Sequence, residues 1–272
     1  MEIRIPAPAK VNLSLWITGR LPNGYHRILT LFYKIPIYDE LWVEEWEEIK
    51  VTCEGIRSGS TNTVYKALNY LSEYVGKKIC LKVRIKKRIP IGGGLGGGSS
   101  DAAAVLKAAN EIFKLGLSVR ELSEVAIKVG ADVPFFILPN RAAIGRGIGE
   151  DLEPLDINVR GKWILVFPAF PVPTKFAYSL IESKGKYTPE DEAEEKLKEL
   201  IKGLKEGKEV RFENDFEDVV FEKFPEIGEI KGSLVKMGWN SSMSGSGSSV
   251  FGLNGEGIEE MKSSYRIWFW EE

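Results

Sequence analysis

The chain has 272 residues, 43% hydrophobic and 28% charged, which is enough apolar material for one large domain or two smaller ones. Its 37 Lys and Arg residues nearly balance 39 Asp and Glu residues, and this disfavours a nucleic-acid partner. No apolar run approaches the roughly 20 residues of a membrane span, and Met1–Arg4 has no signal-peptide pattern. We therefore expect a cytoplasmic protein with no membrane partner.

Three strands and three helices are predicted in the first half of the chain, from apolar alternation and from helical spacing respectively. In chain order they are a strand over residues 3–18, a strand over 41–51, a helix over 62–74, a strand over 79–89, a helix from Asp101 to about Phe113 and a helix over 118–129. Pro6 and Pro8 indicate an edge or a bend in the first strand. Gly130 is a stop signal for the third helix.

The second half contains fewer clear elements. Strands are predicted over residues 162–167, 250–253 and 265–270. Thr188-Pro189-Glu190-Asp191 is typical of a capping box with proline at the first helical position, opening a charged outer helix to about Leu204. A seam near residues 152–161 suggests a division into domains 1–155 and 156–272.

The cysteines and the single histidine do not indicate a metal site. Cys53 and Cys80 have no partners at metal-ligand spacing, and we interpret them as reduced structural thiols. One histidine, His26, cannot build a metal site by itself.

The strongest motif is a glycine-rich run over residues 90–101, between a predicted strand and a predicted helix. At such a position free backbone N–H groups and the helix dipole face an anion, and glycines let phosphate oxygens approach closely. Ser100 or Asp101 could cap the helix. A flexible linker is the alternative, but linkers rarely join a strand directly to a strongly amphipathic helix. A phosphate site is therefore the better interpretation.

Two familiar phosphate loops do not match this run. A P-loop needs a lysine just before the Ser or Thr, and Gly98 occupies that position. Gly92, Gly94 and Gly97 satisfy the dinucleotide fingerprint, but a second helix follows where a Rossmann unit would place a strand and an acidic residue.

The run resembles the phosphate-binding motif of the GHMP kinase superfamily, whose core is a proline, a Gly-Leu-Gly and two serines before a helix. The resemblance implies that the following residues bind nucleotide phosphates: Pro90, Ile91, Gly92, Gly93, Gly94, Leu95, Gly96, Gly97, Gly98, Ser99 and Ser100.

Further segments extend the resemblance from residue 6 to about residue 254. They are Pro8-Ala9-Lys10-Val11-Asn12-Leu13, Gly130-Ala131-Asp132-Val133-Pro134, Asn214-Asp215-Phe216-Glu217 and Ser244-Gly245-Ser246-Gly247. The stretch Gly19–His26 is similar to one branch of the superfamily. Its members phosphorylate the 2-hydroxyl of 4-diphosphocytidyl-2-C-methyl-D-erythritol in the non-mevalonate isoprenoid pathway.

The resemblance implies that Asp132 is the catalytic base and Lys10 its electrostatic partner. From the residues alone, Asp132 would more simply be an N-cap of the next short helix, and Lys10 a snorkelling lysine at a strand edge. Side by side, the lysine would keep the carboxylate ionised, lower the pKa of the acceptor hydroxyl and stabilise charge on the transferred phosphoryl group.

Substrate recognition is implied for four residues. His26 would hydrogen-bond the cytosine, with its one donor and one acceptor when neutral, and Tyr25 would stack on the ring. Tyr178 would cover the other face, with Phe176 as the rival. Asn12 would bind substrate near the acceptor, although a strand-end hydrogen bond is an equally good interpretation.

Two stretches of the second half complete the implied site. The glycine run over residues 241–249 would approach the substrate diphosphate and support the first loop, rather than being a flexible linker. Arg146 stands where the superfamily pattern has an acidic residue, and this departure puts the detail of that wall in question.

The resemblance implies an α+β fold with two lobes, an N-terminal ribosomal-protein-S5-like half and a C-terminal half of sheet plus helices, with the active site in the cleft between them. It also implies ATP as cofactor, with Mg2+ carried by the nucleotide, and a small-molecule substrate with a cytidine diphosphate group. The alternatives are another GHMP kinase, of the homoserine or mevalonate type, and a non-catalytic nucleotide-binding regulator.

Overall fold

The computed structural model describes residues 2–53, 59, 61–257, 261 and 265–272, which form two compact units. Unit 1 consists of residues 1–10, 34–89 and 96–139. Unit 2 consists of residues 11–33, 90–95 and 140–272.

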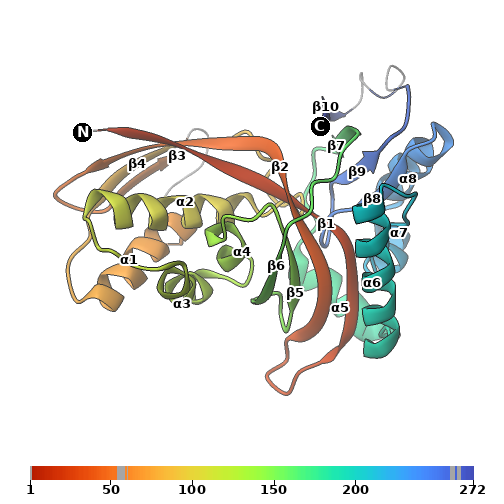
Figure 1. Ribbon diagram of the computed structural model, residues 1–272, viewed down its shortest axis with the longest axis horizontal. Helices are drawn as coiled ribbons and strands as arrows, with labels where there is room; N and C mark the ends of the chain where they lie inside the picture. The colour runs from red at the N-terminus through yellow and green to blue at the C-terminus, as the bar shows by residue number, and fades with distance from the viewer. Residues whose placement is uncertain (1, 54–58, 60, 258–260, 262–264) are drawn as a thin grey trace. The chain divides into compact units, whose positions relative to one another are not determined.

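Figure 1 shows the strands and helices of the described residues. The strands are β1 (Ile3–Arg20), β2 (His26–Glu45), β3 (Lys50–Cys53), β4 (Leu81–Lys86), β5 (Ala142–Arg146), β6 (Asp151–Leu155), β7 (Lys162–Phe167), β8 (Asn240–Met243), β9 (Val250–Leu253) and β10 (Arg266–Glu271). The helices are α1 (Thr63–Val75), α2 (Gly97–Ile112), α3 (Val119–Val129), α4 (Val133–Ile137), α5 (Thr174–Lys184), α6 (Glu190–Glu206), α7 (Glu217–Lys223) and α8 (Pro225–Lys236).

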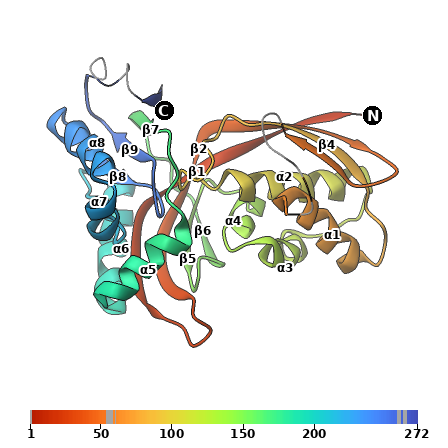
Figure 2. The ribbon, with the colours of Figure 1, turned by 180° about the vertical axis from the view of Figure 1, so that it is seen from behind.

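Unit 1 is a sheet covered on one face by helices. The second half of β2 pairs antiparallel with β4, and β3 pairs parallel with β4 on the other side. Helices α1 to α4 pack on one another and lie on the same side of these strands in both ribbon views (Figures 1 and 2). The alternating burial of β4 follows from this one-sided cover, since every second side chain faces the helices.

Unit 2 contains a four-stranded antiparallel sheet in the order β10-β7-β9-β8. Helix α8 packs on β8 and β9, and α7 packs on α5 and α8. In the same unit the first half of β2 pairs with β5, which continues to β6. The core of unit 2 includes the fully buried Phe216, Ile227 and Leu234 from its helices.

Several predicted elements are confirmed with their local chemistry. Helix α1 begins after Asn62, whose side chain accepts a hydrogen bond from Val64 N at 2.9 Å. Helix α3 begins after Ser118, which forms a reciprocal capping box with Glu121. Strands β7 and β9 have the predicted bounds. The prolines of β1 are tolerated because β2 is its strand partner within the described part of the chain, leaving an edge.

Three predicted elements are wrong in detail. The strand expected over residues 41–51 is the end of β2 followed by the separate strand β3, because the chain turns in the glutamate-rich stretch between them. Helix α2 begins at Gly97 rather than at Asp101. The capping box at Thr188 is absent, because its hydroxyl donates to Asp215 at 2.8 Å and Pro189 occupies the N-cap position of α6.

The compact units group the chain differently from its sequence order. Strands β1 and β2 are long, and each contributes residues to both units. The glycine-rich run is also divided between the units, after Leu95. The division into residues 1–155 and 156–272 stays a prediction about domains in sequence order.

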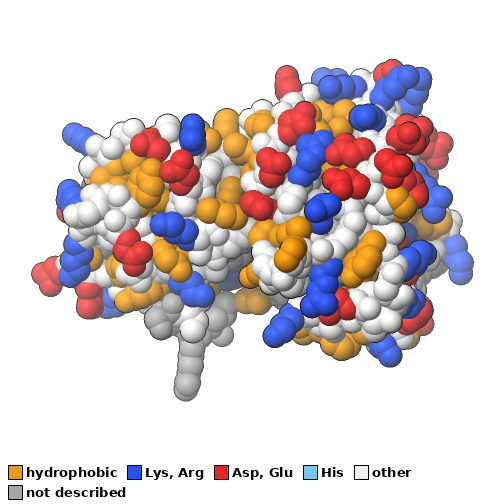
Figure 3. All heavy atoms as spheres, turned by 90° about the horizontal axis from the view of Figure 1, so that it is seen from below, with side chains coloured by type: hydrophobic (Ala, Val, Ile, Leu, Met, Phe, Trp, Pro, Cys, Tyr) orange, Lys and Arg blue, Asp and Glu red, His pale blue; other side chains and the backbone are white. Residues whose placement is uncertain are grey.

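The described surface agrees with the nearly balanced charge. On the face drawn in Figure 3, basic and acidic side chains are interspersed, without a large area of one sign. Among the helices of the described residues, none has the length and apolarity to cross a membrane. Within the described residues, neither Cys53 nor Cys80 forms a disulfide bond.

Candidate functional site

Lys10 and Asp132 lie together in unit 1. The ammonium of Lys10, on β1, is 3.6 Å from the Asp132 carboxylate, which directly precedes α4. Asp132 occupies the N-cap position of α4, but its side chain makes no capping hydrogen bond. The carboxylate is therefore directed to Lys10 rather than to the helix end. The Lys10 side chain is 5% exposed, whereas that of Asp132 is 35% exposed.

Burial and the carboxylate act on Lys10 in opposite directions. Desolvation lowers the pKa of the Lys10 ammonium, and the charge and hydrogen bond of Asp132 raise it. A β-carbon added to Gly96 would lie 3.2 Å from Lys10 Cγ and 2.9 Å from the Phe136 ring. The start of α2 thus packs directly on the lysine, and only glycine leaves the necessary space.

The first turn of α2 has an anion-binding geometry. Gly96, with φ +67°, is the N-cap residue, and the first helical bond runs from Ser100 N to Gly96 O. The N–H groups of Gly97, Gly98 and Ser99 therefore precede the helical ladder, as at every helix N-terminus. Ser100 lies inside the helix instead of capping it, and its buried hydroxyl has no hydrogen-bond partner among the described residues.

A second lysine–aspartate group lies under the same helix in unit 1, and sequence reasoning missed it. The Lys87 ammonium bonds to Asp39 and, at 2.8 Å, to Asp101. The other Asp39 oxygen accepts hydrogen bonds from Arg88 N and Ile89 N. Burial raises the pKa of Asp101 to about 7, although Lys87 acts in the opposite direction. Asp101, predicted as a cap, is thus a buried member of this group.

The other part of the glycine-rich run, residues 90–95, lies in unit 2 and packs on the second run. The Ser244 hydroxyl donates to Gly94 O at 3.0 Å, and Ser249 N donates to Gly93 O at 3.2 Å. At Gly94, where φ is +77°, an added β-carbon would lie 2.0 Å from Ser244 O. Close packing between the two runs therefore requires glycine here.

His26 belongs to an aromatic cluster in unit 2. The Tyr178 ring stacks on the imidazole, with centroids 4.6 Å apart and planes 15° apart, and Tyr187 lies 6.1 Å away. His26 Nε2 lies 3.5 Å from Glu182 Oε1, but this contact lacks hydrogen-bond geometry, so Nε2 has no hydrogen bond among the described residues. Burial lowers the pKa of His26. The Glu182 carboxylate opposes this shift and Arg20 adds to it, and the net lowering favours the neutral imidazole.

The remaining predicted substrate residues have different surroundings. Tyr25 follows a tight turn at Asn23 and is 60% exposed. Phe176, the rival of Tyr178, packs edge-on against Phe224 instead. Asn12 is buried, and its side chain donates to the Thr30 hydroxyl at 2.8 Å. Asn12 thus makes a side-chain hydrogen bond from the middle of β1 to β2 rather than at a strand end, while its contact with substrate stays a prediction.

Comparisons with known proteins agree with this arrangement. Residues 62–140 match the family model "GHMP kinases N terminal domain", and residues 192–266 match "GHMP kinases C terminal". The 4-diphosphocytidyl-2-C-methyl-D-erythritol kinase of Chloroherpeton thalassium is 38% identical over 93% of this chain and 90% of its own. That of Thermodesulfovibrio yellowstonii is 39% identical over 90% and 87%. The chain belongs to the 4-diphosphocytidyl-2-C-methyl-D-erythritol kinase family.

Solved structures give the same fold. A crystal structure of 4-(cytidine 5'-diphospho)-2C-methyl-D-erythritol kinase has a TM-score of 0.82 and 35% identity, covering 99% of this chain and 98% of its own. Homoserine kinase from Cytophaga hutchinsonii has a TM-score of 0.75 but 18% identity, covering 99% and 93%, and shows the fold alone. The expected α+β GHMP kinase fold is therefore confirmed, and the chain is an ATP-dependent small-molecule kinase by family.

Arg146, the departure from the superfamily pattern, has a structural partner in this family member. Its guanidinium contacts both carboxylate oxygens of Glu194 on α6, at 2.9 and 3.2 Å, and Glu153 on β6 at 3.0 Å. The arginine thus ties β5 to α6 within unit 2.

Other residues that sequence reasoning left without a role also make specific contacts. Asp39 is separated from Lys87 by about fifty positions and carried no motif, so no local signal identified it. Asn214–Glu217 was singled out only by resemblance, and the structure shows its side chains holding the second glycine run.

Proposed function

We propose that the protein transfers the γ-phosphoryl group of ATP to the 2-hydroxyl of 4-diphosphocytidyl-2-C-methyl-D-erythritol, a step of the non-mevalonate isoprenoid pathway. The observation that carries the proposal is the similarity to relatives named 4-diphosphocytidyl-2-C-methyl-D-erythritol kinase. They are 35–39% identical to this chain over 90% or more of its length. The local chemistry of each unit supports the same activity.

The first turn of α2 supports nucleotide binding. Its leading N–H groups and dipole favour anionic oxygen, and the buried Ser100 hydroxyl offers an unpaired donor at the same turn. The Thr63 hydroxyl donates to Gly98 O at 2.7 Å and fixes the turn against α1. Residues Gly96–Ser100 accordingly hold phosphate oxygens of ATP. For the Pro90–Leu95 part of the run, the proposal of phosphate binding rests on the sequence resemblance.

The residues at this turn also fit a magnesium–nucleotide complex. Mg2+ prefers oxygen ligands and commonly keeps several waters and phosphate oxygens. The Ser100 hydroxyl is such an oxygen, and no group of three His, Cys, Asp or Glu side chains suited to a metal occurs within the described residues. Ser100 would hold a Mg2+ ion carried by the nucleotide, and that ion would supply positive charge to the transferred phosphoryl group.

Asp132 acts as the base that takes the proton of the acceptor hydroxyl. Its carboxylate is accessible, is not engaged in capping, and has a cation 3.6 Å away. The Lys10 ammonium stabilises negative charge as the hydroxyl loses its proton. Positioning and charge stabilisation of this kind are the main demands of phosphoryl transfer.

The cluster around His26 recognises the cytosine. A neutral imidazole offers one donor and one acceptor, and the unpaired Nε2 atom is available to a pyrimidine edge. The exposed Tyr25 ring stacks on the base, and Tyr178 completes the aromatic wall while also holding the imidazole plane.

The activity is tested directly by incubating the purified protein with Mg-ATP and the cytidyl substrate while ADP release is followed. We expect turnover with this substrate and none above background with homoserine or mevalonate. Phosphorylation of homoserine or mevalonate without turnover of the cytidyl substrate would replace the proposal with another GHMP activity. ATP binding without turnover of any of the three would favour a non-catalytic regulator.

The base-recognition role is tested by Tyr25→Ala and His26→Ala. Losing a stacked ring or a hydrogen bond to the base costs about 1 to 3 kcal/mol, so KM for the cytidyl substrate should rise roughly five- to 160-fold. KM for ATP should stay within about twofold of the parent. Tyr38→Ala is the matched control, since Tyr38 is an exposed β2 tyrosine outside the cluster. Equal effects on both KM values would contradict this role.

A further inference from the structure

Four consecutive residues, Asn214–Glu217, connect several functional parts of unit 2. They precede or begin α7, and β1 reaches them through a parallel bridge between Leu15 and Asn214. Each of the four side chains makes specific contacts, and Asn214 and Glu217 both bond to the backbone of Met243. The segment therefore has a denser set of specific contacts than its role as a connection between α6 and α7 requires.

Asn214 uses its whole side-chain amide on the backbone. The amide nitrogen donates to Met243 O at 2.6 Å and to Gly245 O at 2.8 Å, and the amide oxygen accepts from Phe216 N at 3.0 Å. The side chain is buried, so water cannot replace these bonds. Asn214 thus fixes the carbonyl groups on both sides of Ser244.

Ser244 passes this constraint to the nucleotide loop. Its hydroxyl donates to Gly94 O at 3.0 Å and accepts from Asn12 N at 3.3 Å. Its own carbonyl oxygen packs so closely on Gly94 that no β-carbon fits there. A displacement of Ser244 would therefore move Gly94, which belongs to the phosphate-binding run.

Glu217 braces the same strand end from the other side. One carboxylate oxygen accepts from the Ser242 hydroxyl at 3.0 Å and from Met243 N at 2.8 Å, and the other bonds to Lys231. Residues 242 to 245 are thus held at four points by two side chains of one short segment.

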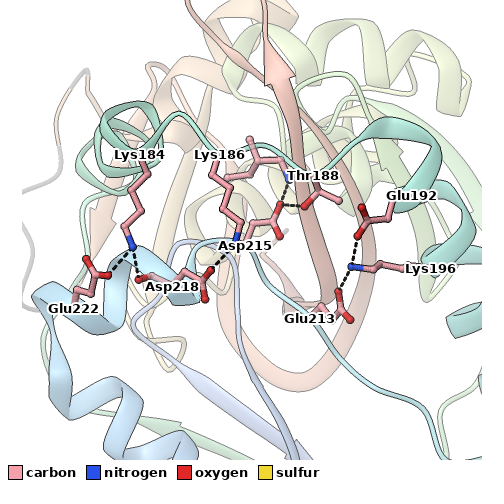
Figure 4. Close-up of polar contacts among 10 residues, drawn as sticks. Lys184, Lys186, Thr188, Glu192, Lys196, Glu213, Asp215, Asp218 and Glu222 are labelled. Carbon is pink, nitrogen blue, oxygen red and sulfur yellow. Dashed lines mark hydrogen bonds and ion pairs between the residues drawn. The ribbon is translucent and has the colours of Figure 1, made fainter.

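The two middle residues of the segment, Asp215 and Phe216, contact β1 and the aromatic cluster around His26. Phe216 packs edge-on against Tyr178, with ring centroids 4.9 Å apart, and Tyr178 in turn stacks on His26. Asp215 accepts from Ile17 N at 2.7 Å and from the Thr188 hydroxyl (Figure 4). The first bond fixes the segment to β1 and the second fixes it to the residues before α6, where Thr188 and Asp215 line a pocket of about 190 Å³.

We propose that Asn214 is a positioning residue for the nucleotide-binding loop, acting through Ser244 on Gly94, while Phe216 positions the base-recognition cluster through Tyr178. One segment thereby fixes two binding functions by separate contacts. The inference deepens the proposed function and depends on it for the identity of the two ligands.

The first test is Asn214→Asp, which removes the amide donor and faces two carbonyl oxygens with a carboxylate. Calorimetric titration with Mg-ATP, which needs no turnover, should show a dissociation constant at least fivefold higher than that of the parent. Asn240→Asp is the matched control, because the Asn240 amide also donates to a backbone carbonyl, Val210 O, outside the site. It should leave ATP affinity within twofold.

A double-variant cycle distinguishes positioning through Ser244 from general damage. Ser244→Ala should weaken Mg-ATP binding as Asn214→Asp does. The double variant should bind Mg-ATP as tightly as whichever single variant has the lower affinity. Additive losses would overturn the route through Ser244. If Asn214→Asp does not fold, Asn214→Ser, which keeps one donor, takes its place in the cycle.

The second contact is tested by Phe216→Leu. KM for the cytidyl substrate should rise at least threefold, while ATP affinity should stay within twofold of the parent. A matching loss of ATP affinity would overturn the separation of the two contacts. If the wild type binds Mg-ATP but does not use the cytidyl substrate, the proposed substrate fails, whereas the Asn214 cycle on ATP binding still decides the role of Asn214.

Discussion

Unit 1 contains two lysine–aspartate groups that differ in the solvent exposure and hydrogen bonding of their carboxylates. Lys87 lies between Asp39 and Asp101, all three side chains are at most 14% exposed, and Asp39 also accepts two backbone hydrogen bonds. Lys10 is equally buried, but its partner Asp132 is 3.6 Å away, about a third exposed and unused by the helix that it precedes. One group is closed by its own hydrogen bonds, and the other leaves a carboxylate open.

The difference separates stability from chemistry. A buried charge costs several kcal/mol unless it is paired and hydrogen-bonded, and removal of one partner from a closed group exposes that cost. An accessible carboxylate beside a buried cation is less important for folding, but it can accept a proton while its charge is supported. The Lys87 group should therefore matter most for folding, and the Lys10–Asp132 pair most for turnover.

The largest expected effect is on turnover in Asp132→Ala. Removal of a general base should lower kcat by about 10²- to 10⁴-fold. The free energy of unfolding should fall by less than the roughly 3 kcal/mol typical of a closed buried group, because solvent reaches the Asp132 carboxylate. Steady-state ADP release and urea unfolding measure the two quantities. Lost Mg-ATP binding in a folded variant would show that Asp132 holds the nucleotide instead of acting as the base.

Asp39→Asn should give the reverse pattern. The new amide can keep its oxygen toward Arg88 N and Ile89 N, but it places a donor against the Lys87 ammonium. We expect a loss of about 3 kcal/mol in the free energy of unfolding. The folded fraction should retain kcat within about tenfold of the parent. A drop in kcat as large as that of Asp132→Ala, with unchanged stability, would exchange the roles of the two groups.

The sequence predicts parts of this comparison through local signals. The helices predicted over residues 62–74 and 118–129 begin directly after Asn62 and Ser118, which cap them through residues within one turn. Resemblance identified Lys10 and Asp132, and the contact between them in unit 1 is consistent with that prediction. Their roles in catalysis stay predictions.

Long-range polar contacts are the part that local patterns could not predict. Thr188 has the sequence of a capping box, yet its hydroxyl bonds to Asp215, a residue distant in the chain. Asp101 is typical of an early helical residue that could cap, but its partner Lys87 draws it into a buried group. In each case a tertiary partner competes with the local hydrogen bond, and only the fold determines which bond forms.

The last expected effect concerns pH and is spread over about three pH units, so that it is small at each step. Burial raises the pKa of Asp101 from the ordinary value of 3.8 to about 7, and the charged groups that act on it are Lys87 and Asp39. Between these two pH values the folded protein keeps a proton that the unfolded chain has released. The free energy of unfolding should therefore fall as pH rises from about 4 to about 7, by no more than about 1.4 kcal/mol per pH unit.

Asp101→Asn isolates this dependence, since the amide keeps an oxygen for Lys87 and cannot ionise. Urea midpoints at pH 5, 6, 7 and 8 should fall with pH in the parent and vary less in the variant, the two curves differing most in slope below pH 7. Asp132→Asn is the matched control in the open pair and should follow the parent. Equal slopes in the parent and in Asp101→Asn would mean that Asp101 is ionised throughout this pH range. The charge of Lys87 would then offset the cost of burying the Asp101 carboxylate, and the closed group would carry a net negative charge beneath α2.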